Sequence, residues 1–250
     1  MRLLFLNPNT SAHLTELGVA IAGKVARPET EIVAATGQFG ARYISTRATA
    51  AIAAHAALDA FARCQPAPDV VLLACFGDPG LMALRELAPV PVVGMAEASC
   101  HAAAILGGKF SIVTGGHRWG PMLEEFVAMI GLASKLASVR TLAPSGAEIA
   151  ADPQAALEGL AATCRRAAQE DGAEVVILGG LGLAGLADRL AEQVPVPVID
   201  SVVAAVRAAE AAAGLGARKA ATGSFAPAMP IETAALSTPL AALLAGGRGG

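Results

Sequence analysis

Two stretches of this chain decide its fold because they repeat each other: VVLLACFGDPGLMALRELAPVPVVGM at residues 70–95 and VVILGGLGLAGLADRLAEQVPVPVID at residues 175–200. Val70 aligns with Val175 at an offset of 105 residues, which holds until a single residue is inserted late in the second stretch. Each stretch opens with an apolar run typical of a buried parallel strand and continues with a segment of helical period. The chain is therefore predicted to contain a duplicated α/β unit.

The same alternation extends outward over most of the chain. Short apolar runs alternate with longer Ala-rich segments of helical period, which is typical of a parallel sheet covered by helices on both faces. The expected strands are residues 3–6, 31–35, 70–74, 90–93, 110–114, 138–142, 175–178 and 196–199. The expected helices are residues 11–26, 48–63, 80–87, 96–106, 121–130, 153–170 and 183–193.

This pattern predicts an α/β fold of two pseudo-symmetric lobes, each a four-stranded parallel sheet flanked by helices. The first lobe is expected to comprise residues 1–98 and 203–250, and the second residues 99–202. A helix near residues 202–213 would return to brace the first lobe. Ligands of open α/β sheets bind at the carboxyl ends of the strands, so we expect the site in the cleft between the lobes.

The end of the chain departs from this regular pattern. Residues 214–238 contain scattered Gly and Pro with little periodicity, and the Gly-rich end at residues 246–250 is expected to be frayed. No Ser- or Pro-rich linker divides the two halves, so packed lobes are expected rather than independent domains.

The composition favours a soluble protein that acts on a small-molecule substrate. The 250 residues are 54% hydrophobic and 16% charged, with a formal net charge of −3. Such a weak field would gather neither nucleic acid nor anionic lipid, so neither is an expected partner. The apolar runs are too short for a signal-peptide core or a membrane span. A reducing cytoplasm is the expected setting, and whether the protein is a monomer or a homo-oligomer stays open.

Cys75 is the candidate catalytic residue. It follows the buried run VVLLA and precedes the turn FGDPG, which opens a helix. A thiol at a helix N-terminus meets unpaired N–H groups and the positive end of the helix dipole, which would lower its pKa. The alternative is a small core residue, which is the interpretation of Cys64, Cys100 and Cys164.

Other polar residues stand at further strand ends. Asn7 would either point its carboxamide into the cleft or cap a helix, whereas capping is sufficient to explain residues 9–11. In the second half Thr114 and Gly115 occupy the matching strand end, where free N–H groups can bind a carboxylate or imide oxygen. His117 follows them, as either a second proton-transfer group or a surface residue.

Three acidic residues near strand ends are interpreted as helix caps. Asp78 is expected to cap the helix that follows its turn, and Glu97 and Asp200 either cap a helix or orient a neighbour. The run Gly179-Gly180-Leu181-Gly182 lacks the order of a dinucleotide-binding fingerprint, and the sequence contains no phosphate loop or zinc-ligand cluster.

Several motifs appear in a familiar order: LNPNTS at the first strand end, ACFGDPG around Cys75, GMAEAS, and LGGLGLAGL followed by PVPVID. Together they resemble the Asp/Glu/hydantoin racemase superfamily, particularly its hydantoin and allantoin racemase branch, over about residues 1–213. The resemblance implies two cysteines, one from each lobe, that flank an acidic carbon of the substrate. One thiolate would remove the proton while the opposite thiol donates another, without pyridoxal phosphate or metal, so no cofactor is expected.

Gly180 stands where both the resemblance and the internal repeat place the second cysteine. Glycine has no side chain that could hold a proton. The alternatives are a racemase whose second face is served by His117, another side chain or water, a one-thiol decarboxylase of an activated malonate, a binding protein that retains the cleft, or a sequence variant.

The expected function is an isomerase-like proton transfer at a carbon next to a carbonyl, in a hydantoin, allantoin or amino-acid derivative. Cys75 would be the acid/base, and Asn7 would position the substrate. Gly180 would lie at the substrate site, and backbone N–H groups would hold the developing enolate oxygens near Phe76, Gly77, Thr114, Gly115 and Leu181.

Overall fold

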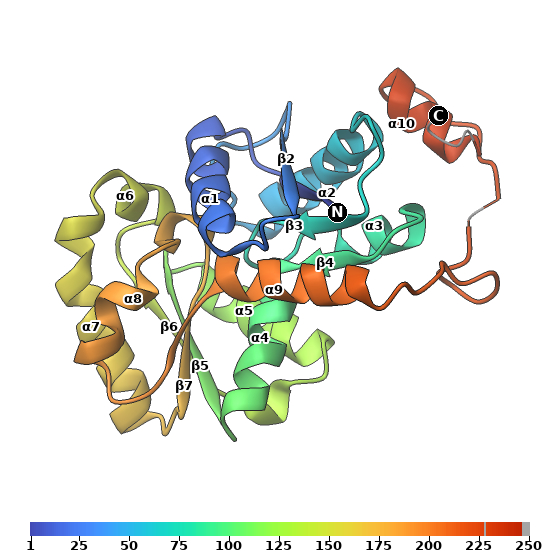
Figure 1. The fold of residues 1–250 in the computed structure, drawn as a ribbon. Helices are drawn as coiled ribbons and strands as arrows, with labels where there is room; N and C mark the ends of the chain where they lie inside the picture. Colours follow the sequence, from blue (N-terminus) through green and yellow to red (C-terminus); the bar gives the residue numbers. More distant parts are fainter. Residues whose placement is uncertain (228, 247–250) are drawn as a thin grey trace.

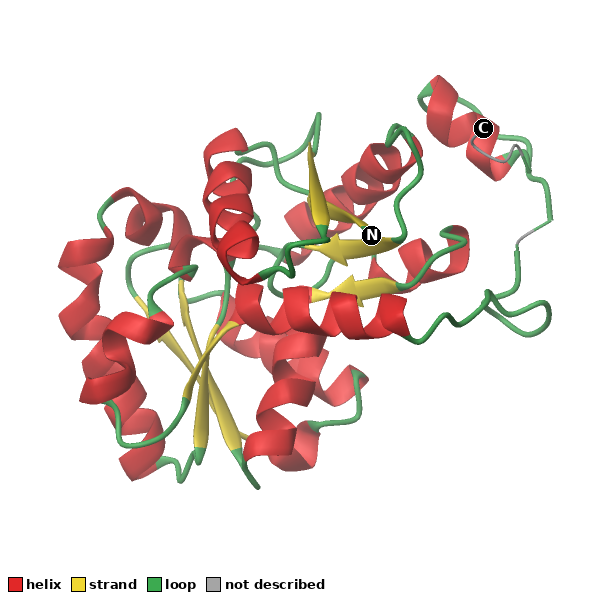
Figure 2. Cartoon of the chain, viewed as in Figure 1, coloured by secondary structure: helices red, strands yellow, loops and turns green. Residues whose placement is uncertain are grey.

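The computed structural model describes residues 1–227 and 229–246, and within them the chain forms two four-stranded sheets. The strand orders are β2-β1-β3-β4 and β6-β5-β7-β8, and all neighbouring strands are parallel. The second order repeats the first, as the internal duplication predicts. Figures 1 and 2 show helices on both faces of each sheet, so the predicted α/β fold is confirmed.

The first sheet has its most buried strands at its centre. Its strands are β1 (Arg2–Asn7), β2 (Glu31–Thr36), β3 (Val70–Leu73) and β4 (Val92–Gly94), with helices α1 (Ala12–Val25), α2 (Arg47–Ala62) and α3 (Leu81–Leu87). The apolar residues of β3 are fully buried, which explains its unbroken apolar sequence. Leu6 of β1 pairs with Leu73 of β3, so Asn7 and Cys75 leave the sheet at the same edge.

The second sheet repeats this arrangement. Its strands are β5 (Phe110–Gly115), β6 (Leu136–Leu142), β7 (Val175–Leu178) and β8 (Val198–Asp200). Its helices are α5 (Trp119–Met129), α6 (Gly146–Ala151), α7 (Pro153–Glu170) and α8 (Ala187–Leu190), with short 3-10 turns η1 (Ala133–Lys135), η2 (Leu181–Leu183) and η3 (Ala191–Gln193). Val113 pairs with Leu178, which places Thr114 and Gly180 at one edge.

Two helices cross between the sheets. Helix α4 (Met95–Leu106) follows the first sheet but packs against β5, β7 and β8 of the second. Helix α9 (Ser201–Gly214) follows the second sheet but packs against α1, β3 and β4 of the first, and the two helices contact each other (Figure 1). The expected return of residues 202–213 to the first lobe is therefore confirmed, while the exact lobe boundaries stay a prediction.

Some elements differ from the sequence expectation. A single helix over residues 183–193 was expected, but a left-handed Gly185 (φ 79°) interrupts it, leaving only α8 and η3. Helix α6 and the C-terminal helix α10 (Thr238–Leu244) were not predicted. Helix α10 packs on α2, and Leu240 is buried there. Fraying was expected for residues 246–250, of which residues 247–250 lie outside the described residues.

Within residues 1–227 and 229–246, no helix combines the length and the hydropathy that crossing a bilayer requires.

Candidate functional site

A small cavity lies at the edge where β3, β5 and β7 end. Its volume is about 50 Å³, and residues of both halves line it. The first half contributes Asn9, Tyr43 and Cys75, and the second contributes Thr114 and Gly180. Pockets for drug-sized ligands are about 300–1,000 Å³, so this cavity is small by comparison. Two wider surface hollows contain none of these five residues.

Cys75 lies in the cavity wall with 8% of its surface exposed. Its carbonyl accepts the N–H of Asp78 at 3.0 Å, which closes the turn after β3. Burial raises the pKa of the thiol above its ordinary value, and the negative charge of Asp78 raises it further. Helix α3 begins only at Leu81, beyond the turn. The expectation of a lowered pKa is therefore wrong, because Cys75 is buried and lies before the start of the helix, and the resting thiol is protonated at neutral pH.

Asp78 caps a different helix from the one expected. Its carboxylate accepts the N–H groups of Ala96 at 2.9 Å and Glu97 at 2.8 Å, which are in the first turn of α4, not α3. Burial raises the pKa of Asp78 to about 7, although these two N–H groups favour the charged form. Asp78 therefore ties the Cys75 turn to the helix that crosses to the second sheet.

The other two acidic residues have different roles. Asp200 accepts the N–H of Val202 at 2.8 Å and so caps α9, as predicted. Glu97 forms an ion pair with Arg85 and orients that neighbour, with no capping hydrogen bond from its side chain among the described residues.

Gly180 shares the cavity with Cys75 and holds a conformation that favours glycine. Its φ is 118°, in a region that side-chain-bearing residues rarely adopt. A Cβ built on Gly180 would have only Thr114 Oγ1 within 4 Å among the described residues, at 3.9 Å. The cavity wall at this position is therefore backbone, with room for a side chain that the glycine does not supply.

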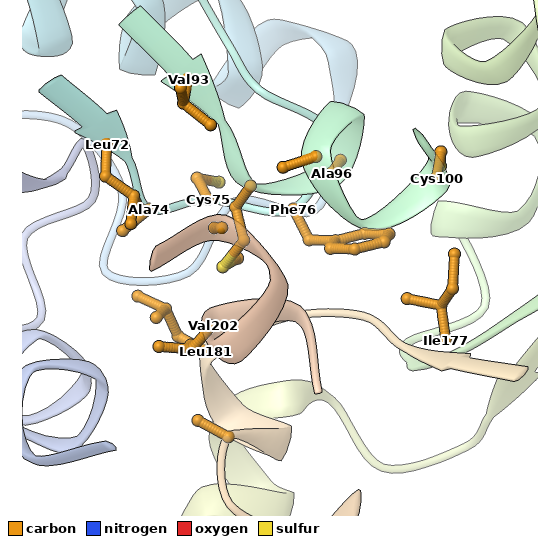
Figure 3. Packing of buried hydrophobic residues seen from close by; sticks show 14 of the residues in the cluster. Leu72, Ala74, Cys75, Phe76, Val93, Ala96, Cys100, Ile177, Leu181 and Val202 are labelled. Carbon is orange, nitrogen blue, oxygen red and sulfur yellow. The ribbon is translucent and has the colours of Figure 1, made fainter. Parts of the chain in front are cut away.

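Two backbone N–H groups are available at equivalent positions of the two halves. Phe76 follows Cys75 and Leu181 follows Gly180, the two positions that the repeat aligns. Both residues line the cavity. Neither N–H donates a hydrogen bond within the described part of the chain. The Phe76 ring turns toward Cys100 and Ile177 in the core (Figure 3). These N–H groups are suited to binding a developing negative charge.

Gly77 and Gly115 were also predicted to contact the substrate, but neither lines the cavity. A Cβ at Gly77 would lie 2.7 Å from the ring of Trp119, and one at Gly115 would lie 2.6 Å from the carbonyl oxygen of Pro144. Both glycines therefore permit close packing behind the cavity wall.

Thr114 and Tyr43 bring hydroxyl groups to the cavity. Thr114 Oγ1 donates to the carbonyl of Gly179 at 2.7 Å, so its proton is already bound. The Tyr43 hydroxyl donates to the carbonyl of Gly115 at 3.2 Å and accepts the N–H of Gly146 at 3.1 Å. Burial raises the pKa of Tyr43, so this phenol stays neutral at pH 7. Tyr43 thus connects the first half to the second across the site.

Asn7 and Asn9 have the opposite roles to those expected. Asn7 is fully buried and does not line the cavity, and its Nδ2 donates to Thr15 Oγ1 at 2.9 Å and to Asn9 Oδ1 at 2.9 Å. Asn9 lines the cavity with 6% of its surface exposed. The residue expected to position the substrate therefore holds its neighbour instead.

His117 lies outside this group of residues. It is exposed, its Nδ1 is 3.5 Å from Thr141 Oγ1, and it does not line the cavity. The structure therefore does not bring His117 together with Cys75.

Tyr43 and Asn9 are among the cavity residues that sequence reasoning missed. Tyr43 lies in the irregular loop between β2 and α2, where no periodic pattern points to a contact with the second half. Asn9 stands within the LNPNTS motif, so the signal was present but was assigned to capping alone.

The family model described as Asp/Glu/Hydantoin racemase matches residues 3–209. A hydantoin racemase of Paenarthrobacter aurescens is 38% identical over 227 residues, which cover 90% of this chain and 96% of that protein.

Two solved structures illustrate the range of similarity. The crystal structure of allantoin racemase from Pseudomonas fluorescens has a TM-score of 0.90 and 37% identity, covering 94% of this chain and 100% of that chain. A mutant of arylmalonate decarboxylase, with one glycine changed to cysteine and one cysteine to serine, has a TM-score of 0.65 and 19% identity. It covers 86% of this chain and 94% of that chain, and at this identity the likeness concerns the fold alone.

Proposed function

Because this chain belongs to the Asp/Glu/hydantoin racemase family, we propose that it is a racemase-type enzyme that moves a proton at a carbon next to a carbonyl. The substrate would be a hydantoin, allantoin or amino-acid derivative, and Cys75 would be the acid/base. The relatives named as hydantoin and allantoin racemases support this class of substrate.

One observation carries the proposal: Cys75 and Gly180 line the same small cavity at equivalent strand ends. The free N–H groups of Phe76 and Leu181 lie in the same wall. They would stabilise an enolate oxygen while the thiol acts at the neighbouring carbon. A proton-transfer site needs the proton-carrying group and the oxyanion donors within reach of one small molecule, and their shared lining of this cavity supports that arrangement.

The reaction would proceed on one face of the substrate. The Cys75 thiolate takes the proton from the carbon, so an S–H bond forms, the C–H bond breaks and the electron pair moves into the enolate. The same thiol, after exchange with solvent, returns a proton to that face and restores the original configuration. Inversion needs a donor on the other face, where Gly180 offers only backbone. We therefore expect exchange with solvent to be faster than inversion.

A second candidate is decarboxylation of an activated malonate, and the protonation of Cys75 favours it. Loss of carbon dioxide leaves the electron pair on carbon, so the enzyme needs a proton donor but no base. A buried thiol with a raised pKa is such a donor. The two reactions differ in pH dependence, because proton abstraction needs the thiolate, whereas decarboxylation needs the thiol.

The test is the exchange of substrate C–H for deuterium, followed by NMR in D₂O with single enantiomers of 5-substituted hydantoins and of allantoin. We expect exchange to accelerate as the pH rises from 7 toward 10, and to fall at least about 100-fold in Cys75→Ala. Cys164→Ala is the matched control, because Cys164 is buried in the second core and does not line the cavity.

Three results would count against the proposal. Exchange that persists in Cys75→Ala would show that the Cys75 thiol does not transfer the proton. Carbon dioxide release from an arylmalonate without exchange of hydantoins would favour the decarboxylase. Binding of a hydantoin without exchange would favour a binding protein.

A further inference from the structure

We infer that Asn9 donates a hydrogen bond from its carboxamide Nδ2 to a carbonyl oxygen of the substrate, and that Asn7 fixes it in that orientation. The inference rests on the proposed function, whose substrate carries a carbonyl next to the reacting carbon. It assigns to Asn9 a contact that the sequence interpretation gave to Asn7.

The orientation of the Asn9 carboxamide is fixed by two donors that meet its oxygen. Asn7 Nδ2 donates to Asn9 Oδ1 at 2.9 Å, and the Ser11 N–H donates to the same oxygen at 2.9 Å. A rotated carboxamide would place its NH₂ group against these donors, so the assignment of oxygen and nitrogen follows from the contacts. Nδ2 must therefore point away from Asn7.

Asn7 is itself held rigidly. It is fully buried, its Oδ1 accepts the Asn9 N–H at 3.2 Å, and its Nδ2 also donates to Thr15 Oγ1. The Thr15 hydroxyl in turn lies 2.7 Å from that of Thr36 on β2. Both the backbone and the side chain of Asn9 are thus positioned by a buried network that joins β1, α1 and β2.

The Asn9 Nδ2 group is unpaired yet accessible. It donates no hydrogen bond within the described residues, where no fully buried side-chain nitrogen or oxygen lacks a partner. Nδ2 must therefore face an open space, although only 6% of the surface of Asn9 is exposed. Asn9 lines the cavity that contains Cys75, and this cavity is the space available to it.

The chemistry of this donor suits a neutral carbonyl that becomes an enolate. Among the described residues that line the cavity none is Lys, Arg or His, so uncharged donors must bind the developing negative charge. The Asn9 carboxamide is already held by its other hydrogen bonds, so its N–H donor needs no reorganisation during the reaction. Its hydrogen bond strengthens as negative charge grows on the substrate oxygen. Asn9 would then lower the barrier and also contribute to binding.

The test compares Asn9→Ala and Asn9→Asp with the wild type, with Ser11→Ala as the matched control. Ser11 lies in the same loop and its side chain caps α1, but it does not line the cavity, and its backbone N–H is kept. Deuterium exchange into a 5-substituted hydantoin gives kcat and KM. Calorimetry with 5,5-dimethylhydantoin, which has no exchangeable C5 hydrogen, measures binding alone.

We expect exchange kcat to fall about 100-fold in Asn9→Ala, the usual effect of removing one donor to a developing oxyanion, and to be unchanged in Ser11→Ala. Binding of 5,5-dimethylhydantoin to Asn9→Asp should strengthen at low pH, where the protonated carboxyl can donate, and a purely structural role would not produce this pH profile. Binding of 5,5-dimethylhydantoin should weaken in Asn9→Ala.

The outcomes separate this inference from the proposed function. Wild-type exchange with equal exchange and equal binding in folded Asn9→Ala overturns the role of Asn9 and leaves the proposed function standing. Binding of 5,5-dimethylhydantoin that depends on Asn9, without any exchange, supports Asn9 and overturns the proposed function. A wild type that neither exchanges nor binds hydantoins overturns both.

Discussion

Introducing a thiol at position 180 tests whether the two strand ends face one substrate, because Gly180→Cys should convert slow inversion into racemisation. The built Cβ has no neighbour closer than 3.9 Å among the described residues, so a thiol at this position has room in the cavity. It would face the substrate from the half opposite to Cys75. A general acid or base raises the rate of proton transfer about 100-fold or more, so we expect the ratio of inversion to exchange to rise by about that factor.

The same substitution should reduce stability by an amount that the backbone sets. The φ of Gly180 is 118°, and a side-chain-bearing residue held in such a region costs about 1–3 kcal/mol. For a chain of this size each kcal/mol lowers the melting temperature by about 2–4 °C. Gly180→Ala carries the same backbone cost without the thiol, so it is the matched control for activity and stability.

The assay follows single enantiomers of a 5-substituted hydantoin by chiral chromatography and deuterium exchange by NMR in parallel samples. Gly180→Cys should raise inversion relative to exchange, whereas Gly180→Ala should leave that ratio as in the wild type. If Gly180→Cys is folded, retains exchange and inverts no faster than Gly180→Ala, then the two strand ends do not face one substrate and the geometric reasoning is refuted.

Two further predictions concern the surroundings of the cavity. Tyr43→Phe removes two hydrogen bonds between the halves, each worth about 0.5–1.5 kcal/mol, so urea unfolding should show a loss of about 1–3 kcal/mol; an unchanged midpoint would contradict the bridging role. Burial raises the pKa of Asp78 from 3.8 to about 7, so the folded state binds this proton more tightly than the unfolded chain. The free energy of unfolding should therefore fall as the pH rises from about 4 to about 7, and Asp78→Asn should flatten this slope in urea titrations; an equal slope in the variant would contradict the shift.

The sequence was sufficient to predict the sheets because their signal is local. The apolar runs of the duplicated stretches correspond to β3 and β7, and the four strands of each half appear in the predicted order along the chain. The prediction of one helix over residues 183–193 was wrong, because the left-handed Gly185 interrupts a segment whose composition is otherwise typical of a helix. Apolar periodicity does not report such a backbone conformation.

The site was less predictable because its properties depend on burial and on distant contacts. The position of Cys75 at a strand end was readable, but its pKa depends on how deeply the turn is buried and on Asp78. The exchange of roles between Asn7 and Asn9 depends on Thr15, which the motif does not include. Tyr43 reaches the cavity only through contacts with the second half.

The crossing of α4 and α9 bears on whether either half could stand alone. A solitary half, expressed as a short polypeptide, would send its last helix away from its own sheet and leave one sheet face uncovered. Two copies side by side would each cover the other by exchanging that helix. The two halves therefore depend on each other, because each sheet is covered in part by a helix that the other half supplies.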